Sequence, residues 1–320
     1  MSEEHNKVWY RNRAQVIKFV QGHTKINYGC NGRGIVSNYH LFDGISLFFL
    51  DFDTDDIMDY QKSNPDIISI VYCHKGRYEC EFSNQQTFYV PAGSFAIMGT
   101  KDLPVSFSFP LKKCFAFSLV INRQNLSEET KKILEIFHLN VDQIIERLEL
   151  DERNYLSSPV AGSELEQLFE KIYNARERGE IEYFRIKALE FLYNISRLSK
   201  DDGCELEYCD KKYKKAVKKI CHEMKENPDE KMSLKKLAKK YDINLSMFHK
   251  VFSQIYGETP YAYLKKYKMS LAADELKNSG RRINEIAVSL GYNNASKFTI
   301  AFKSVYGIGP KDYRKSQTIK

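Results

Sequence analysis

The last third of this chain of 320 residues contains one sequence pattern twice. The first copy is SLKKLAKKYDINLSMFHKVFSQIYGETPYAYL, and the second is RINEIAVSLGYNNASKFTIAFKSVYGIGPKDYR. After a one-residue insertion the copies run at an offset of 50, which pairs Phe248 with Phe298 and Phe252 with Phe302. A duplication of this length predicts two copies of one small structural unit.

Each copy has the pattern of a helix-turn-helix. A first helix carries apolar residues at i, i+3 and i+4, starting from Leu234 in the first copy and Ile283 in the second. Asn244 and Asn294 are suited to cap the second helix, and Gly291 suits the turn before it. The second helix buries two Phe residues four apart, which leaves a polar side that can enter the major groove. The stretch PYAYLKKYKMSLAADELKN between the copies predicts a rigid helical spacer.

The charge of the same region favours a nucleic-acid partner. From residue 211 to the end there are 25 Lys and Arg against 10 Asp and Glu, whereas residues 1–200 carry 24 against 27. A basic module beside a near-neutral one is typical of a chain whose C-terminal part binds nucleic acid. A solvated lysine-rich surface is the alternative, and we interpret Lys211–Lys219 in that way.

The preceding residues have a different pattern. Short runs rich in Ile, Val, Tyr and Phe, separated by turn residues, extend over about 28–122 and predict an antiparallel β-barrel or sandwich. Helical patterns follow, and EIEYFRIKALEFLYNISRL carries an apolar stripe. The stripe consists of Phe184, Ala188, Phe191, Leu192 and Ile195. It either packs within its own domain or forms a dimer interface, and the sequence leaves both open.

These patterns together predict an α+β chain with an antiparallel β-barrel, following helices and an all-α C-terminal domain. The expected divisions are a β domain at 1–126, a helical dimerisation segment at 127–200, a linker at 201–212 and a DNA-binding domain at 213–320. Within the last, the helix-turn-helix motifs are expected at about 233–257 and 282–307.

The C-terminal part resembles the AraC/XylS family of bacterial transcription regulators. IAVSLGYNNASKFTIAFKSVYGIGPKDYR is close to that family's C-terminal signature, and the resemblance covers about residues 213–315. Residues of about 20–120 resemble, more weakly, the family's cupin-like effector-binding domain. The resemblance implies a regulator that binds promoter DNA, is controlled by an unknown small-molecule effector in the barrel and forms a homodimer. If it is an activator, it also implies contact with RNA polymerase.

The resemblance further implies which residues contact DNA. In the family, base contacts come from the exposed face of each second helix, and the matching positions are Ser246, His249, Lys250, Ala295, Ser296, Lys297, Thr299 and Ile300. Lys303 and Arg314 are expected to add phosphate contacts. Where the family often has Arg, which can bind guanine with two hydrogen bonds, this chain has Lys250 and Ile300. The second motif is therefore expected to depend less on direct hydrogen bonds to bases, unless Ile300 packs against a neighbouring helix.

The stretch VYCHKGRYECEF has the densest mixture of polar and aromatic residues in the β region. It supplies the candidate effector-binding residues Tyr72, His74, Arg77 and Tyr78. Arg77 is suited to a carboxylate or phosphate, with a surface pair to Glu79 as the alternative. Cys73 and Cys80 could lie close across the hairpin, which makes thiol redox sensing a further hypothesis.

Other functions lack their motifs. The chain has no HxH pair of a metal-dependent cupin and no GxSxG, P-loop or Rossmann fingerprint, so we expect no enzyme, metal or cofactor. It has no run of about 20 apolar residues, and its first ten residues lack a secretory pattern. We therefore expect a cytoplasmic protein without a membrane segment. A DNA-binding protein that needs no effector, and a barrel with its own sensor or enzymatic chemistry, are the alternative functions.

Overall fold

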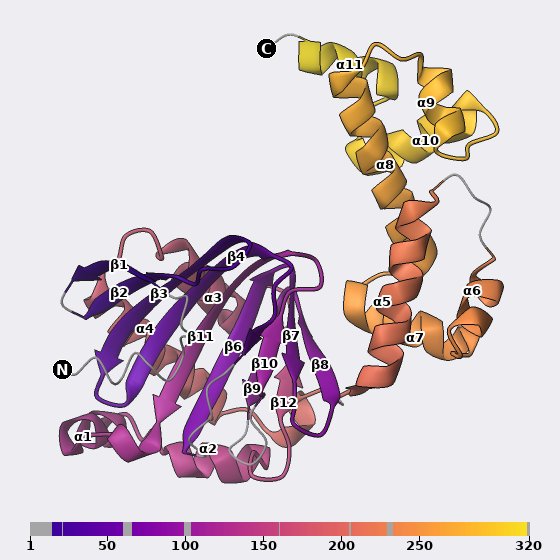
Figure 1. Ribbon diagram of the computed structural model, residues 1–320. Coiled ribbons are helices and arrows are strands. Elements are labelled where there is room, and N and C mark those ends of the chain that lie inside the picture. Colours follow the sequence, from indigo (N-terminus) through magenta and orange to yellow (C-terminus); the bar gives the residue numbers. More distant parts are fainter. Residues whose placement is uncertain are drawn as a thin grey trace. The chain divides into compact units, whose positions relative to one another are not determined.

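The computed structural model describes residues 15–20, 22–59, 66–98, 104–159, 161–204, 206–228 and 233–318. The chain divides into two compact units, at residues 1–208 and 209–320 (Figure 1). The first fourteen residues, on which the expectation about a secretory signal depends, lie outside the described part. None of the helices described is long and apolar enough to cross a membrane.

The described residues of the N-terminal unit form two antiparallel sheets. The larger has the strand order β1-β2-β3-β4-β11-β6-β9-β12. Its strands are β1 (Gln15–Val20), β2 (His23–Asn27), β3 (Gly32–Phe42), β4 (Ile45–Thr54), β11 (Lys113–Asn122), β6 (Ile67–Lys75), β9 (Ser94–Met98) and β12 (Tyr155–Ser157). The smaller has, within this unit, the order β8-β7-β10-β5. Its strands are β8 (Gln86–Pro91), β7 (Arg77–Glu81), β10 (Ser106–Ser108) and β5 (Met58–Asp59).

The two sheets face each other across an aromatic core. Val71 and Cys73 of β6 point into it from the larger sheet, and Tyr78 and Cys80 of β7 point into it from the smaller one. Alternate residues of this hairpin therefore face the core between the sheets. The predicted α+β class is confirmed. The sheets do not close into a barrel, so that detail of the prediction is wrong. Alternating strands suit both forms, because closure depends on the register of distant edge strands.

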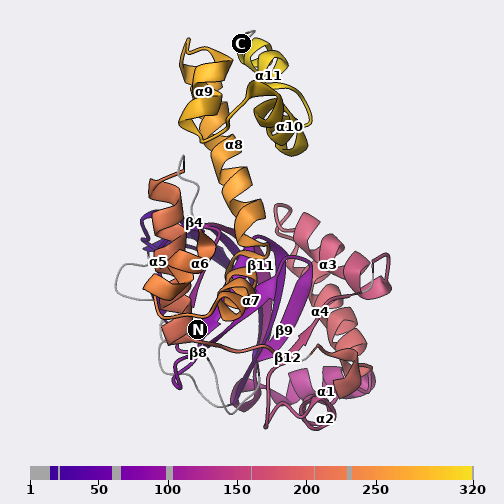
Figure 2. The same ribbon diagram turned by 90° about the vertical axis from the view of Figure 1, so that its right-hand side faces the viewer.

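Helices cover the opposite face of the larger sheet (Figure 2). They are α1 (Glu128–Ile136), α2 (Val141–Leu148), α3 (Glu164–Asn174) and α4 (Ile181–Ser196). Ser127 caps α1, and its side chain accepts the N–H of Thr130. Phe169 of α3 contacts Tyr72 and Phe117 of the sheet, with ring centroids 4.3 and 5.7 Å apart. These helices share one core with the sheet, so α1 to α4 form a layer of this unit.

The apolar stripe of α4 is buried within the same unit. Its five residues are each at most 4% exposed and belong to the core beneath the larger sheet: Phe184, Ala188, Phe191, Leu192 and Ile195. The Phe184 ring contacts those of Tyr39 and Phe49 at 4.8 and 5.4 Å. The expectation that these residues form a dimer interface is therefore corrected, because side chains that fill a core cannot also face a partner.

After the short strand β13 (Cys209–Asp210), the described part of the C-terminal unit is helical. Its helices are α5 (Lys211–Glu226), α6 (Leu234–Lys240), α7 (Leu245–Tyr256), α8 (Pro260–Asn278), α9 (Ile283–Ser289), α10 (Ala295–Tyr306) and α11 (Pro310–Thr318). Helices α6 and α7 form the first predicted motif, and α9 and α10 form the second. The spacer α8 is about 28 Å long at 1.5 Å per residue. Its buried residues Met269, Ala272 and Leu276 share a core with α9 and α10.

We predict that Phe184→Ala lowers the free energy of unfolding of the N-terminal unit by about 3–5 kcal/mol, because it leaves a cavity in a fully buried site. The exposed Ile186 on the same helix is the matched control, and Ile186→Ala is expected to change stability by less than about 0.5 kcal/mol. Denaturant unfolding followed by circular dichroism measures both. Equal effects of the two substitutions would contradict the described packing of α4.

Candidate nucleic-acid interface

The turns of the two motifs have the same backbone geometry. Asp242 and Gly291 occupy equivalent positions and both have positive φ, at 53° and 77°. The following residues make matching backbone hydrogen bonds, from Ile243 to Ala238 and from Tyr292 to Ala287, each at 3.0 Å. The left-handed conformation costs a residue with a Cβ roughly 1 kcal/mol, which glycine avoids. The first turn is therefore more strained than the second.

The second helix of each motif begins at an asparagine cap, as predicted. The side-chain oxygen of Asn244 accepts the N–H of Met247 at 2.7 Å, and that of Asn294 accepts the N–H of Lys297 at 2.8 Å. The first turn of an α-helix has backbone N–H groups without intrahelical partners and carries partial positive charge. The N-termini of α7 and α10 can therefore bind a phosphate group.

Equivalent aromatic clusters fix the orientation of α7 and α10. Phe248, Phe252, Phe298 and Phe302 have no measurable exposure, which confirms the predicted buried side. In the first motif the rings of Phe252, Tyr256 and Tyr263 lie 4.5–5.5 Å apart. In the second, those of Phe302, Tyr306 and Tyr313 lie 4.7–5.3 Å apart. Because these rings hold one side of each helix inward, the opposite side faces solvent.

The predicted DNA-contacting residues lie mainly on these outward sides. Ser246 and Lys250 of α7 are exposed, and His249 between them is half-buried. On α10 the exposed residues are Ser296, Lys297, Ile300 and Lys303, while Ala295 and Thr299 are half-buried. Ile300 is 70% exposed, so the alternative that it packs against a neighbouring helix is wrong.

The similarity of this chain to known proteins lies in the same region. Residues 237–316 match a family model described as a helix-turn-helix domain. The HTH-type transcriptional regulator AlkR of Acinetobacter baylyi is 35% identical over 28% of this chain and 29% of AlkR. A putative AraC-like transcription regulator of Streptomyces lividans is 38% identical over 21% of this chain and 22% of its own length. The C-terminal unit is a DNA-binding domain of the AraC type.

The matches to these relatives span about a third or less of their length. ToxT of Vibrio cholerae is similar over 85% of this chain and 98% of its own, at 13% identity and a TM-score of 0.33, which is too low to establish a common fold. The sequence similarity to these relatives therefore supports the assignment of the AraC-type domain and does not extend to the N-terminal unit.

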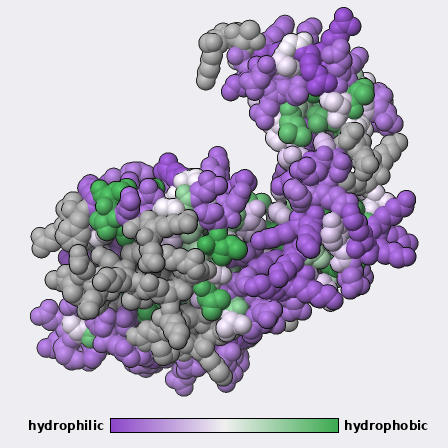
Figure 3. Space-filling model, viewed as in Figure 1, coloured by the Kyte–Doolittle hydropathy of each residue, from purple (hydrophilic) through white to green (hydrophobic). Residues whose placement is uncertain are grey.

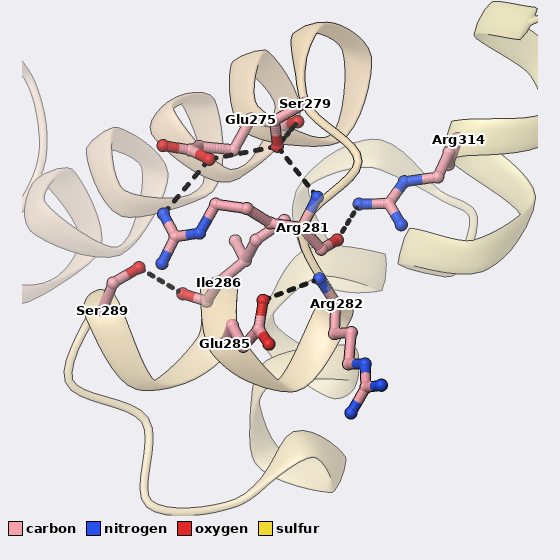
Figure 4. Close-up of polar contacts among 8 residues, drawn as sticks. All are labelled: Glu275, Ser279, Arg281, Arg282, Glu285, Ile286, Ser289 and Arg314. Carbon is pink, nitrogen blue, oxygen red and sulfur yellow. Dashed lines mark hydrogen bonds and ion pairs between the residues drawn. The ribbon is translucent and has the colours of Figure 1, made fainter.

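Arg314 does not point outward from the AraC-type domain. Its guanidinium donates to the backbone carbonyl of Arg281 at 2.7 Å (Figure 4). It also donates to the backbone carbonyl of Leu276 at 3.4 Å. These carbonyls lie at the end of α8 and in the connection to α9, so Arg314 ties α11 to that connection. The expectation that Arg314 contacts phosphate is corrected, because its donors already satisfy backbone groups.

Arg282, which the sequence analysis did not single out, lies where a phosphate contact is feasible. Its backbone N–H donates to the Glu285 carboxylate at 3.0 Å, and α9 begins at the next residue. Its guanidinium extends away from the junction in Figure 4, whereas that of the neighbouring Arg281 pairs with Glu275 at 3.2 Å. Two adjacent arginines before an apolar helix are a signal that could have suggested it.

In Figure 3 the visible surface of the AraC-type domain is mostly hydrophilic, as a DNA-binding surface requires.

The effector candidates of the N-terminal unit do not surround one site. Tyr72 packs on α3, and burial raises its pKa to about 12. His74 stacks on Tyr173 of α3 at 3.7 Å between ring centroids, and burial lowers its pKa although Glu170 lies 3.1 Å away. Tyr78, in contrast, points between the sheets and stacks on Phe107. The idea of one site at this hairpin is corrected, because alternate residues of a strand face opposite sides of the sheet.

Arg77 and the cysteines give no further support to a site at the hairpin. The Arg77 guanidinium lies over the Tyr89 ring, 5.7 Å from its centroid. Cys73 and Cys80 are completely buried, and burial raises the pKa of Cys80 well above its usual value. The thiol beside Cys73 is that of Cys114, whose pKa is raised well above its usual value by burial and further by Cys73. Thiols with raised pKa react slowly with oxidants, so the redox hypothesis loses its chemical basis.

We predict that Arg314→Ala lowers the free energy of unfolding of the AraC-type domain by about 1–3 kcal/mol, because two backbone carbonyls lose a charged donor. Lys311→Ala, at an exposed position of α11, is the matched control and is expected to have little effect. Thermal unfolding of both variants checks this. A stable Arg314→Ala variant whose DNA affinity becomes less dependent on salt would indicate a phosphate contact instead.

Proposed function

We propose that this chain is a sequence-specific transcription regulator of the AraC/XylS type that binds promoter DNA through both motifs. The observation that carries the proposal is the duplicated motif itself. Both second helices have the same cap, the same buried aromatic cluster and an outward polar side. Such a helix fits the width of the major groove and places side chains near base edges.

The residues have different proposed roles in the two motifs. In the first, Ser246, His249 and Lys250 contact bases, with Lys250 able to donate to guanine. In the second, Ala295, Ser296, Lys297 and Thr299 face the groove, and Ile300 contacts the methyl group of thymine. Lys303 and Arg282 bind phosphates, as do the free backbone N–H groups at the N-termini of α7 and α10.

Because α8 joins both motifs, they are proposed to enter successive major-groove segments on one face of the DNA. Successive segments are about one helical turn, roughly 10 bp, apart. A homodimer would cover two such pairs of sites. The α4 stripe is unavailable for dimerisation, so the dimer, if formed, uses another surface.

Regulation is proposed to come from a small-molecule effector bound by the N-terminal unit. An effector that binds one arrangement of the chain better than another shifts the population toward it and changes which sites can be occupied. For an activator, RNA polymerase is the expected further partner, and the cytoplasm is the expected location. The relatives matched are transcription regulators, which gives no support to an enzymatic role. The alternative is a protein that regulates without an effector. A ligand screen in which no compound stabilises the N-terminal unit would favour it.

We predict that Lys250→Ala weakens binding to the specific site by about 1–3 kcal/mol and relaxes selectivity at one base pair. Ile300→Ala is expected to reduce only the preference for thymine over cytosine at its own position, since it removes an apolar contact. Fluorescence anisotropy with systematically substituted duplexes measures both. If Lys250→Ala weakens binding to random DNA equally, Lys250 contacts phosphate only.

We also predict that genome-wide footprinting of the purified protein on its host DNA gives discrete sites. Each site is expected to contain two short boxes about one helical turn apart. A chain substituted in α10 alone, such as Lys297→Glu, should lose protection of one box first. Diffuse protection that disappears uniformly with added salt would contradict sequence-specific regulation.

A further inference from the structure

The interior of the N-terminal unit has little room for a ligand, whereas a groove on its helical side has ample room. Between the sheets, the cavity that Tyr78 lines has a volume of about 40 Å³. That is enough for about one water molecule. The groove between the helix-facing side of the larger sheet and the connection from α3 to α4 measures about 470 Å³. Ligand sites in proteins typically measure about 300–1,000 Å³.

The walls of this groove are set by the register of the larger sheet and by one turn. Lys25 of β2, Ser37 of β3 and Phe49 of β4 lie side by side in one cross-strand row and line the sheet wall. The opposite wall includes Arg178 and Gly179 of the α3–α4 connection. Gly179 has a φ of +69°, a conformation that glycine adopts without strain and that turns the chain back toward the sheet.

The charge of the groove is strongly positive. Its lining contains five Lys and Arg side chains against two carboxylates. The carboxylates are already engaged, since Asp51 pairs with Arg33, and Glu177 with Arg176 at 3.4 Å. Among the described residues, no carboxylate pairs with the remaining cations, which are Lys18, Lys25 and Arg178.

The sheet register adds an unfavourable contact to this excess. Lys18 of β1 lies directly opposite Lys25 of β2 across the antiparallel pair. Like charges in directly opposed positions destabilise a sheet. Together with burial, these two lysines also lower the pKa of His23. A negatively charged ligand would remove this repulsion.

The body of the groove is rigid and partly aromatic. The rings of Tyr39 and His23 stack at 4.1 Å, and the Tyr39 hydroxyl donates to the Arg176 carbonyl at 3.4 Å. The Arg176 guanidinium lies over the Tyr173 ring, 4.1 Å from its centroid. These contacts preorganise the site, and the half-buried His23 ring offers part of its surface to a carbon skeleton.

We propose that this groove binds a small organic anion with at least two carboxylate or phosphate groups. The lysines of β1 and β2 hold one acidic group, Arg178 on the other wall holds the second, and the His23 ring contacts the skeleton. Its identification with the effector site rests on the proposed function, but binding itself does not. A ligand that bridges the sheet and the α3–α4 connection would tighten the packing at the start of α4.

The test uses the full chain and isothermal titration calorimetry at constant ionic strength. The probes are citrate for carboxylates, fructose 1,6-bisphosphate for phosphate esters, inorganic phosphate and uncharged glucose. Saturable binding is expected for citrate or fructose 1,6-bisphosphate and not for glucose. The double variant Lys25→Gln with Arg178→Gln is expected to bind at least about tenfold more weakly, since each charged hydrogen bond contributes substantially. Lys171→Gln, at an exposed position of α3 outside the groove, should bind normally.

Lack of saturable binding by both organic anions would overturn the proposal, as would equal affinity of the double variant. Inorganic phosphate that binds as tightly as fructose 1,6-bisphosphate would overturn the role of the skeleton that joins the two acidic groups. Lys18→Gln, on an exposed side chain, gives an independent variant if the double variant unfolds. DNA binding by the full chain is measured separately, without any anion. A chain that fails to bind DNA would contradict the proposed function, whereas anion binding to the groove is decided by calorimetry alone.

Discussion

The packing of two aromatic clusters is the interaction on which the C-terminal unit depends. Each cluster joins a Phe near the end of a second helix to a Tyr that follows it and another on the next helix. Such pairs contribute about 0.5–1.5 kcal/mol beyond the burial of their area. They also fix the rotation of each second helix about its own axis. A helix whose Phe residues point inward at four-residue spacing has only one side left for solvent. The direction of the outward side chains follows from the core.

The two motifs have kept this scaffold while their outward residues have diverged. Position by position, Lys250 in α7 corresponds to Ile300 in α10, and His249 corresponds to Thr299. A long cation and a branched apolar side chain select different base edges, the first through hydrogen bonds and the second through a methyl contact. Asp242 and Gly291 show that even the turn geometry has been kept where its residue has not. Duplication thus supplies the fold, and the exposed positions supply the specificity.

How much of the structure could be predicted depended on how far apart in the sequence the residues that determine each feature lie. Caps, turns and four-residue spacings are local, so the helices of the C-terminal unit were predicted closely. The short β-rich runs are also local and predicted antiparallel strands, but the open edge of the sheets was not predicted. The burial of Phe184 and the bonds of Arg314 to residues more than thirty positions away depend on tertiary contacts. A stripe or a basic residue cannot reveal from sequence whether its partner is a core, a second chain or DNA.

The position of Phe184 also bears on how an anion in the groove could act. Phe184 lies in the first turn of α4 and packs on Tyr39 and Phe49, which also belong to the wall of the groove. The wall of the groove and the packing of α4 therefore share the same two rings. A ligand changes an equilibrium only by the difference between its affinities for the two states, and 1.4 kcal/mol corresponds to a tenfold difference. An anion in the groove relieves the repulsion between Lys18 and Lys25 only in a state that keeps both lysines at the groove. The anion therefore binds that state more tightly than a state that separates the two lysines.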